Sequence, residues 1–135
     1  MSVMDSLDGL VDLDPYPLHD LDGPAGRDLV SDFSAQLAVD GAIVLPGFIV
    51  SKALDAIVTE IGDIAFRAYA GQKQGPIYYG MSGRGFPEDH PRRALLPRNL
   101  SQLSLDLLAA DSKLRRIYHN PFVHQFLAAI RGSGP

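Results

Sequence analysis

The stretch DGAIVLPGFI (residues 40–49) decides the fold class, because it places a short apolar run between two segments of helical periodicity. The run AIVL is rich in β-branched residues and is followed by Pro-Gly, so we predict a buried strand over residues 42–45. Gly41 is suited to end the helix before it, and Ser51 to cap the helix after it. The stretch therefore predicts a helix-strand-helix order.

The helix before this stretch begins near Pro24, which suits a first helical turn, with Asp22 or Gly23 as its cap. Its apolar stripe comprises Leu29, Val30, Phe33 and Leu37. The helix after the stretch is predicted over residues 52–69, and Gly71 closes it. Its apolar face comprises Leu54, Ile57, Val58, Ile61, Ile64 and Ala65.

The rest of the chain alternates short extended and helical signals. A strand is predicted over residues 76–80, followed by a Gly/Pro-rich loop over residues 80–91. Residues 92–97 are compatible with another strand, and the leucine-rich residues 100–110 leave their state open.

Two helices are predicted at the end of the chain. Asp111 or Ser112 starts a short helix that runs through Tyr118. Asn120 and Pro121 then give the N-cap and first position of a last helix. That helix turns Phe122, Phe126 and Ile130 inward and ends at Gly132. The resulting class is α+β, and because two or three short strands do not form a self-sufficient sheet, the apolar helix faces require something further to pack on.

Composition limits the class of protein. A chain of 135 residues allows one domain, and 46% apolar with 21% charged residues is typical of a globular protein. No apolar run approaches the ~20 residues of a membrane span, and the acidic start lacks the basic region of a signal peptide. The absence of cysteine excludes disulfides, thiolate nucleophiles and cysteine metal sites. We therefore expect a cytoplasmic protein without a membrane partner.

Charge is distributed unevenly along the chain. Residues 1–40 contain nine Asp and one Arg, whereas residues 41–135 contain eleven Lys/Arg and seven Asp/Glu. We interpret residues 1–15 as a mobile acidic tail and residues 16–135 as the domain. The basic excess indicates a solvated surface that the acidic segment partly offsets, rather than a nucleic-acid interface; arginines that hold an anionic small molecule are the alternative.

No catalytic motif is complete in the sequence. None of the four histidines, at positions 19, 90, 119 and 124, has an acidic residue two positions later, which an iron-binding His-x-Asp or His-x-Glu requires. His119 and His124 are five residues apart across a helix start and make a poor ligand pair. Neither His-Glu-x-x-His nor Gly-x-Ser-x-Gly occurs. We therefore predict no catalytic and no metal-ligating residue in this chain.

A polar set flanks the long loop and gives the candidate binding residues. Tyr78, Arg92, Arg93 and Arg98 lie beside it in the sequence. Arginines on strands beside a loop clamp carboxylates in bidentate fashion, although ordinary surface charge explains the same pattern.

Several segments resemble, in order, the N-terminal half of Fe(II)/2-oxoglutarate-dependent oxygenases. They are YPLHDLDGPAGRDLV (16–30), DGAIVLPGFI (40–49), IYYG (77–80), HPRR (90–93) and SKLRRIYHNPFVHQFLAAIRG (112–132). Within that family, the segments resemble most the subgroup of small bacterial amino-acid hydroxylases and radical halogenases. The order of a helix, DGAIVLPGF and a second helix is also similar to the phytanoyl-CoA dioxygenase-like branch. The resemblance implies N-terminal helices and a few strands that buttress a double-stranded β-helix (jelly-roll) barrel, most of which is missing from this chain.

The resemblance also implies a chemistry. Fe(II) and 2-oxoglutarate are the family's cofactors, and its reaction is hydroxylation or halogenation of a small molecule such as an amino acid. The family's His-x-Asp (or His-x-Gly), distal His and 2-oxoglutarate-binding Arg follow the helix that corresponds to residues 121–131, so none is matched here. The resemblance therefore implies a truncated oxygenase that is inactive alone, binds neither cofactor alone, and contributes Tyr78 and Arg92 as substrate-side residues.

Two alternatives compete with this reading. The first is a non-catalytic interaction module that docks on a full-length protein partner through exposed helix faces and the acidic tail. The second is an unrelated small enzyme that uses His90 and the arginine-bearing loop. A folded monomer without an exposed apolar patch would remove the basis of the first.

Overall fold

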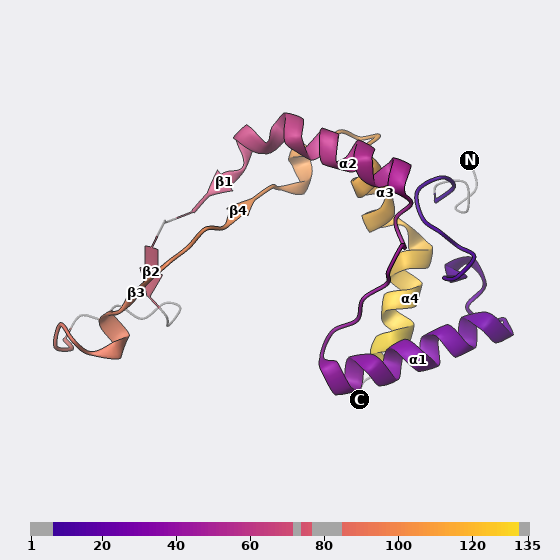
Figure 1. Ribbon diagram of the computed structural model, residues 1–135, viewed down its shortest axis with the longest axis horizontal. Helices are drawn as coiled ribbons and strands as arrows, with labels where there is room; N and C mark the ends of the chain where they lie inside the picture. Colours follow the sequence, from indigo (N-terminus) through magenta and orange to yellow (C-terminus); the bar gives the residue numbers. More distant parts are fainter. Residues whose placement is uncertain (1–6, 72–73, 77–84, 133–135) are drawn as a thin grey trace. The chain divides into compact units, whose positions relative to one another are not determined.

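The computed structural model describes residues 7–71, 74–76 and 85–132 (Figure 1). The chain forms two compact units, one from residues 1–63 and 108–135 and the other from residues 64–107. The first unit is built mainly of helices, and the second contains short antiparallel strands and turns. The predicted α+β class is confirmed, and the described strands form small sheets that do not close a barrel.

Helix α1 (Pro24–Asp40) forms as predicted. Gly23 is its N-cap, Pro24 occupies the first turn, and Gly41 ends it with a φ of 69°. This left-handed conformation suits glycine and lets the Gly41 N–H donate to the Leu37 carbonyl at 2.9 Å. The predicted stripe of Leu29, Val30, Phe33 and Leu37 packs on a buried cluster, as expected.

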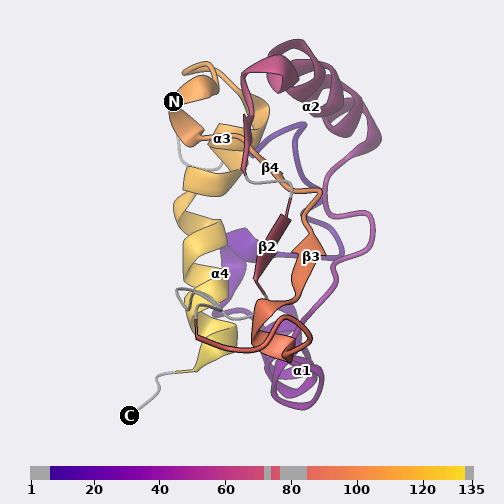
Figure 2. The ribbon, with the colours of Figure 1, turned by 90° about the vertical axis from the view of Figure 1, so that its left-hand side faces the viewer.

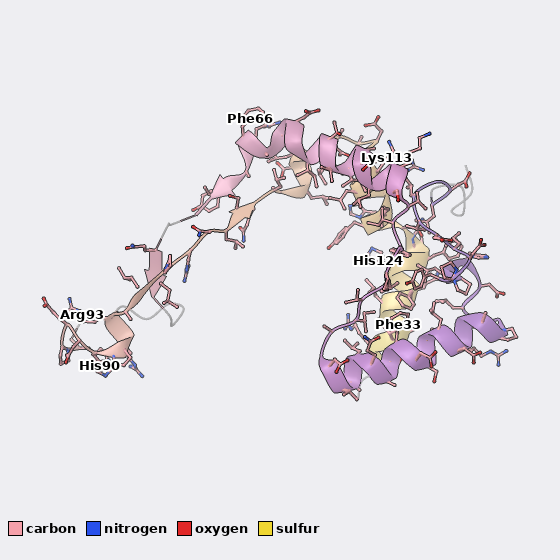
Figure 3. All side chains as sticks on the ribbon, in the orientation of Figure 1. Phe33, Phe66, His90, Arg93, Lys113 and His124 are labelled. Carbon is pink, nitrogen blue, oxygen red and sulfur yellow. The ribbon has the colours of Figure 1, made fainter. Side chains whose placement is uncertain are left out.

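The core beneath α1 is shared with helix α4 (Pro121–Arg131). Leu18, Phe126 and Ile130 are its buried members, and the Phe33 ring meets the Phe126 ring edge-on at 5.9 Å. The labelled Phe33 lies between α1 and α4 (Figure 3). Such edge-to-face packing adds about 0.5–1.5 kcal/mol to the gain from buried area, and so strengthens the contact between these two helices.

The short helix α3 (Lys113–His119) and α4 begin as predicted. Ser112 Oγ accepts from the Arg115 N–H at 3.2 Å, and Asn120 Oδ1 accepts from the Phe122 N–H at 2.9 Å. Both caps satisfy amides that a helix start leaves without partners. The predicted end at Gly132 is confirmed, since its N–H donates to the Ala129 carbonyl.

Residues 7–15 depart from the predicted tail. Leu7, Leu10 and Val11 are buried in a core cluster with Ala53, Ile57 and Ile117. Main-chain hydrogen bonds join Asp12 N–H to the Phe48 carbonyl at 2.8 Å and Val50 N–H to the Leu10 carbonyl at 3.0 Å. The apolar residues that alternate with aspartates therefore pack inward, and the tail interpretation is corrected for this segment.

The predicted strand over residues 42–45 is wrong. These residues are in no strand, although Ile43 and Leu45 are half-buried while Val44 is 68% exposed. The apolar signal arises because the two inward side chains pack on the core beneath α1. Main-chain pairing occurs further on instead, where Ile49 forms an isolated bridge with Val11.

Helix α2 (Ser51–Ile64) is shorter than the predicted helix over residues 52–69. The residues predicted to form its last turn instead form a 3-10 turn over Ala65–Arg67 and the start of strand β1 (Tyr69–Ala70).

The predicted face is confirmed in part, because Ile57 is buried and Ile61 packs on the core. Ala53, which was not predicted, is also buried, whereas Leu54 and Val58 are 46% and 62% exposed. Helix α2 therefore carries apolar side chains on a wider part of its surface than the neighbouring segments cover.

The second unit contains two short antiparallel ribbons. Strand β1 pairs with β4 (Ser101–Gln102) (Figure 1). Strand β2 (Gln74–Pro76) pairs with β3 (Leu95–Pro97) (Figure 2). The strand predicted over residues 76–80 thus begins earlier, and residues 77–80 lie outside the described residues. No described strand exceeds three residues. Two-stranded ribbons of this size are marginal in water without further packing.

The strand considered for residues 92–97 is corrected at its start. Residues Pro91–Arg93 form a 3-10 turn, and the strand is confined to Leu95–Pro97. Pro91 fixes a φ that suits the first position of the turn. The leucine-rich residues 100–110 contain β4 and another 3-10 turn over Leu105–Leu107. No helix among the described residues is both long and apolar enough to span a bilayer.

Candidate functional site

The candidate site is the loop of residues 85–93, which we call the basic loop after Arg92 and Arg93, although Glu88 and Asp89 balance their formal charge. Gly85 starts it with a φ of 92°, and the His90 N–H donates to the Pro87 carbonyl at 3.0 Å. His90 Nδ1 then accepts from the Arg92 N–H at 3.2 Å, so His90 caps the turn that Pro91 begins. These local hydrogen bonds give the loop a defined shape.

Phe86 organises the side chains of this loop. The His90 ring stacks on it with centroids 4.4 Å apart, and Arg92 Cζ lies 5.0 Å from the centre of the same ring. Arg93 Nη1 donates to the Phe86 carbonyl at 3.1 Å. The labelled His90 and Arg93 lie at the same turn (Figure 3). One aromatic residue therefore holds a histidine and two arginines together.

The predicted site residues are only partly brought together. Arg92 is half-buried on the 3-10 turn rather than on a strand, and Tyr78 lies outside the described residues. Arg98 follows β3 and covers Gly75, where an added Cβ would approach the guanidinium carbon to 2.5 Å. Arg92 and Arg93 thus belong to one cluster, and Arg98 belongs to the flanking ribbon.

The basic loop places the Arg92 guanidinium beside an aromatic face and the Arg93 guanidinium at the main-chain carbonyl of the same phenylalanine. This combination suits a carboxylate or another planar anion, which guanidinium binds through paired N–H groups. Glu88 and Asp89 are exposed in the same loop. Sequence reasoning missed Phe86, whose four-residue spacing to a His-Pro pair was the available signal.

The four histidines do not fit a ferrous iron site. His124 Nε2 lies 2.7 Å from the Tyr118 carbonyl oxygen, and the His119 ring meets the Tyr118 ring edge-on at 5.4 Å. His19 is exposed on a 3-10 turn, and His90 is held in the basic loop. Among the described residues, no group of three or more His, Asp or Glu is arranged to hold a metal ion.

The carboxyl group of Asp106, in the second unit, has a lowered pKa. The hydrogen bond from the Ser104 side chain lowers the pKa of Asp106 below its usual range, with smaller contributions from its backbone hydrogen bond and from Arg67. Because Asp106 is fully exposed, we attribute to it local ordering of the turn over Leu105–Leu107 rather than a catalytic role.

Comparison with protein-family models, curated proteins and solved structures gives no match for this chain.

Proposed function

We propose that this chain is the scaffold part of an Fe(II)/2-oxoglutarate-dependent oxygenase-like domain and that the metal-binding half is not among its residues. The helices would support a jelly-roll barrel, and the whole domain would hydroxylate or halogenate a small molecule such as an amino acid. The proposal rests on the ordered sequence segments and on the apolar surface described below.

The observation that carries the proposal is the uncovered apolar surface of both units. In the second unit, Phe66, Tyr69, Leu95 and Leu96 are each at least half exposed. In the first, Leu54 and Val58 of α2 are exposed side by side at i and i+4. Apolar surface of this extent, beside strands too short to be stable alone, is expected where a larger sheet normally packs.

The basic loop would form one wall of the substrate site. Arg92 is positioned by Phe86 and by the His90 cap, so less side-chain freedom is lost when it binds an anion. We assign it and Tyr78 to the binding of a substrate carboxylate. Both residues would orient the substrate, and neither would take part in bond breaking.

The residues described here do not fit the family's iron, so no step of a reaction is assigned to them through that metal. In the complete domain, iron and 2-oxoglutarate would supply the oxidising chemistry. The present chain would bind the substrate, exclude water from one side and support the sheet.

The test is an anaerobic titration with Fe(II) and 2-oxoglutarate, followed by the visible charge-transfer absorption of the ternary complex. The chain alone should give no absorption. The product expressed with whatever coding sequence follows residue 135 should give it, and Arg92→Ala in that product should weaken substrate binding while leaving the absorption intact. A following sequence without a His-x-Asp or His-x-Gly motif, or a longer product that binds no iron, would contradict the proposal.

The second candidate is a non-catalytic interaction module, which the exposed Leu54–Val58 pair on α2 favours. In that case Leu54→Ser with Val58→Ser should abolish capture of a protein partner while the helical circular dichroism is unchanged. If the fluorescent dye ANS, which reports exposed apolar surface, does not bind the unmodified chain, this candidate loses its basis.

A further inference from the structure

The β2–β3 ribbon has two edges to which a further strand could be added. Strands β2 and β3 are hydrogen-bonded to each other, and the sheet that they form among the described residues has only two strands. Each strand therefore has one side that no other described strand covers. The outward main-chain groups of such an edge are a template for a strand from another chain, so proteins commonly close their edges or cover them.

Two prolines determine which main-chain groups of the ribbon face outward. In an antiparallel pair of strands, residue pairs that exchange two hydrogen bonds alternate with residues whose N–H and C=O groups point to the outer edges. The three residue pairs of the ribbon are Gln74–Pro97, Gly75–Leu96 and Pro76–Leu95. A proline has no N–H, so neither terminal pair can exchange two bonds. Gly75 and Leu96 are therefore the bonded pair, and both prolines face outward.

Each edge of the ribbon contains one of these prolines. On the β2 edge, Gln74 offers an N–H, whereas Pro76, the next outward position, offers none. On the β3 edge, Leu95 offers an N–H and Pro97 offers none. A strand added at either edge would have a carbonyl group opposite a nitrogen that carries no hydrogen. Prolines within sheets are confined to such edge positions.

Without the prolines, the ribbon would be prone to pair with other copies of the chain. Leu95 and Leu96 are 58% and 50% exposed, and they lie on opposite faces because neighbouring residues of a strand alternate. Exposed apolar side chains beside an open edge favour edge-to-edge association. A two-stranded ribbon is marginal in water, whereas a sheet of more strands with an apolar face can be stable, so each pairing would stabilise the ribbon itself.

We propose that Pro76 and Pro97 close the β2–β3 ribbon against further strands, so that the ribbon recruits no second copy and meets any other surface by a face. The β1–β4 ribbon lacks proline, but its strands contain only two residues each. This inference does not depend on the oxygenase proposal. Where that proposal also holds, the barrel would stack on the β2–β3 ribbon and would not continue it as a wider sheet.

Three valine variants test the closure. Pro76→Val restores a donor to the β2 edge alone and should give a dimer, because the open edge of one copy pairs with the same edge of a second copy and both are then used. Pro97→Val should give a dimer through the β3 edge. The double variant has two open edges on each copy and should form assemblies that grow with concentration. Sedimentation velocity measures their size, and the infrared amide I band detects intermolecular sheet.

Two single substitutions are the matched controls. Gln74→Val adds a β-branched residue to β2 without adding a donor, and Pro87→Val removes an exposed proline from the basic loop. Both variants should sediment like the wild-type chain. Helical circular dichroism checks that α1 and α4 are retained. If a valine variant loses its helices, Pro76→Ala with Pro97→Ala restores the same donors at a lower strand propensity and should also assemble.

Three results would overturn the proposal. The first is a double variant that keeps its helices and still sediments like the wild-type chain. The second is a Gln74→Val chain that assembles as readily as Pro76→Val, because apolar character rather than the restored donor would then govern the association. The third is an intermolecular sheet signal from the wild-type chain itself, because its ribbon edges would then be open.

Discussion

At the scale of single residues, the molecule shows how one aromatic ring organises a polar loop. Phe86 is half-buried, and it holds the His90 ring in a stack and the Arg92 guanidinium within cation-π distance. The arginines could be singled out in the sequence because of their charge. Phe86, which positions them, could not be predicted, because the stack forms only once the His-Pro turn brings position 90 back over position 86.

The stack can be observed directly by proton NMR. In the native chain, the His90 ring protons should be shifted upfield by the ring current of Phe86, 4.4 Å away. Phe86→Leu should remove this shift, whereas Phe66→Leu, at an 84% exposed position, should leave it unchanged. Equal His90 shifts in all three proteins would show that the stack is absent in solution.

A second residue-scale prediction concerns Asp106. Its pKa is lowered chiefly by the Ser104 hydroxyl, so Ser104→Ala should raise the measured pKa of the Asp106 carboxyl toward its ordinary value. A carboxyl with a depressed folded-state pKa stabilises the fold above its unfolded pKa, and this contribution is lost as the pH falls through the folded value. Carboxyl carbon NMR titration measures the change.

Ser101→Ala, in β4 of the same unit, serves as the control and should leave that titration unaltered. An unchanged Asp106 pKa in Ser104→Ala would assign the shift to the backbone or to Arg67 instead.

At the scale of elements, the ends of α1, α3 and α4 were predictable, whereas the last turn and the buried face of α2 were not. Pro24, Gly41, Ser112 and Asn120 act locally, so their residue types alone indicate where α1, α3 and α4 begin or end. The face of α2 depends on what covers it, and both Leu54 and Ile57 are apolar. Sequence could not tell which of the two is buried, because that is decided by the N-terminal residues 7–15.

The covered side of α2 should dominate its contribution to stability. Ile57→Ala removes a side chain that is 5% exposed and should lower the free energy of unfolding by about 2–5 kcal/mol. Val58→Ala, at the adjacent exposed position, should change it by less than about 0.5 kcal/mol. Urea denaturation followed by circular dichroism measures both.

If Ile57→Ala does not fold, the milder Ile57→Val can be measured instead. It should lower the free energy of unfolding by about 0.5–1.5 kcal/mol. Equal losses for Ile57→Val and Val58→Ala would place the wrong side of α2 in the core.

The N-cap of α4 gives a second element-scale prediction. Asn120→Ala removes the acceptor for the Phe122 N–H at a position that is 2% exposed, and should cost about 0.5–2 kcal/mol. Asn120→Ser retains a capping oxygen and should recover most of that loss, while Asn99→Ala, at an exposed position, should cost little. A Ser variant no better than Ala would mean that Asn120 acts through packing rather than capping.

At the scale of the whole molecule, the sequence predicted too few strands for a self-sufficient sheet, and the described residues form only two-stranded sheets. Residues 42–45, which were predicted to form a strand, are in no strand, and the described strands contain two or three residues. Sequence could not locate β1 or β4, because pairs this short depend on register between distant residues rather than on local propensity. The binding role of Tyr78 and Arg92 stays a prediction.

The central claim is that this chain is a scaffold whose ribbons need a further surface to be stable. Amide hydrogen exchange of the isolated chain tests it most directly. We predict that the amides of α1 and α4 are protected from exchange. The amides of the two ribbons, β1 with β4 and β2 with β3, should exchange at nearly the rate of an unfolded peptide. Ribbon amides as protected as those of α4 would show that the chain is stable by itself, and would contradict the claim.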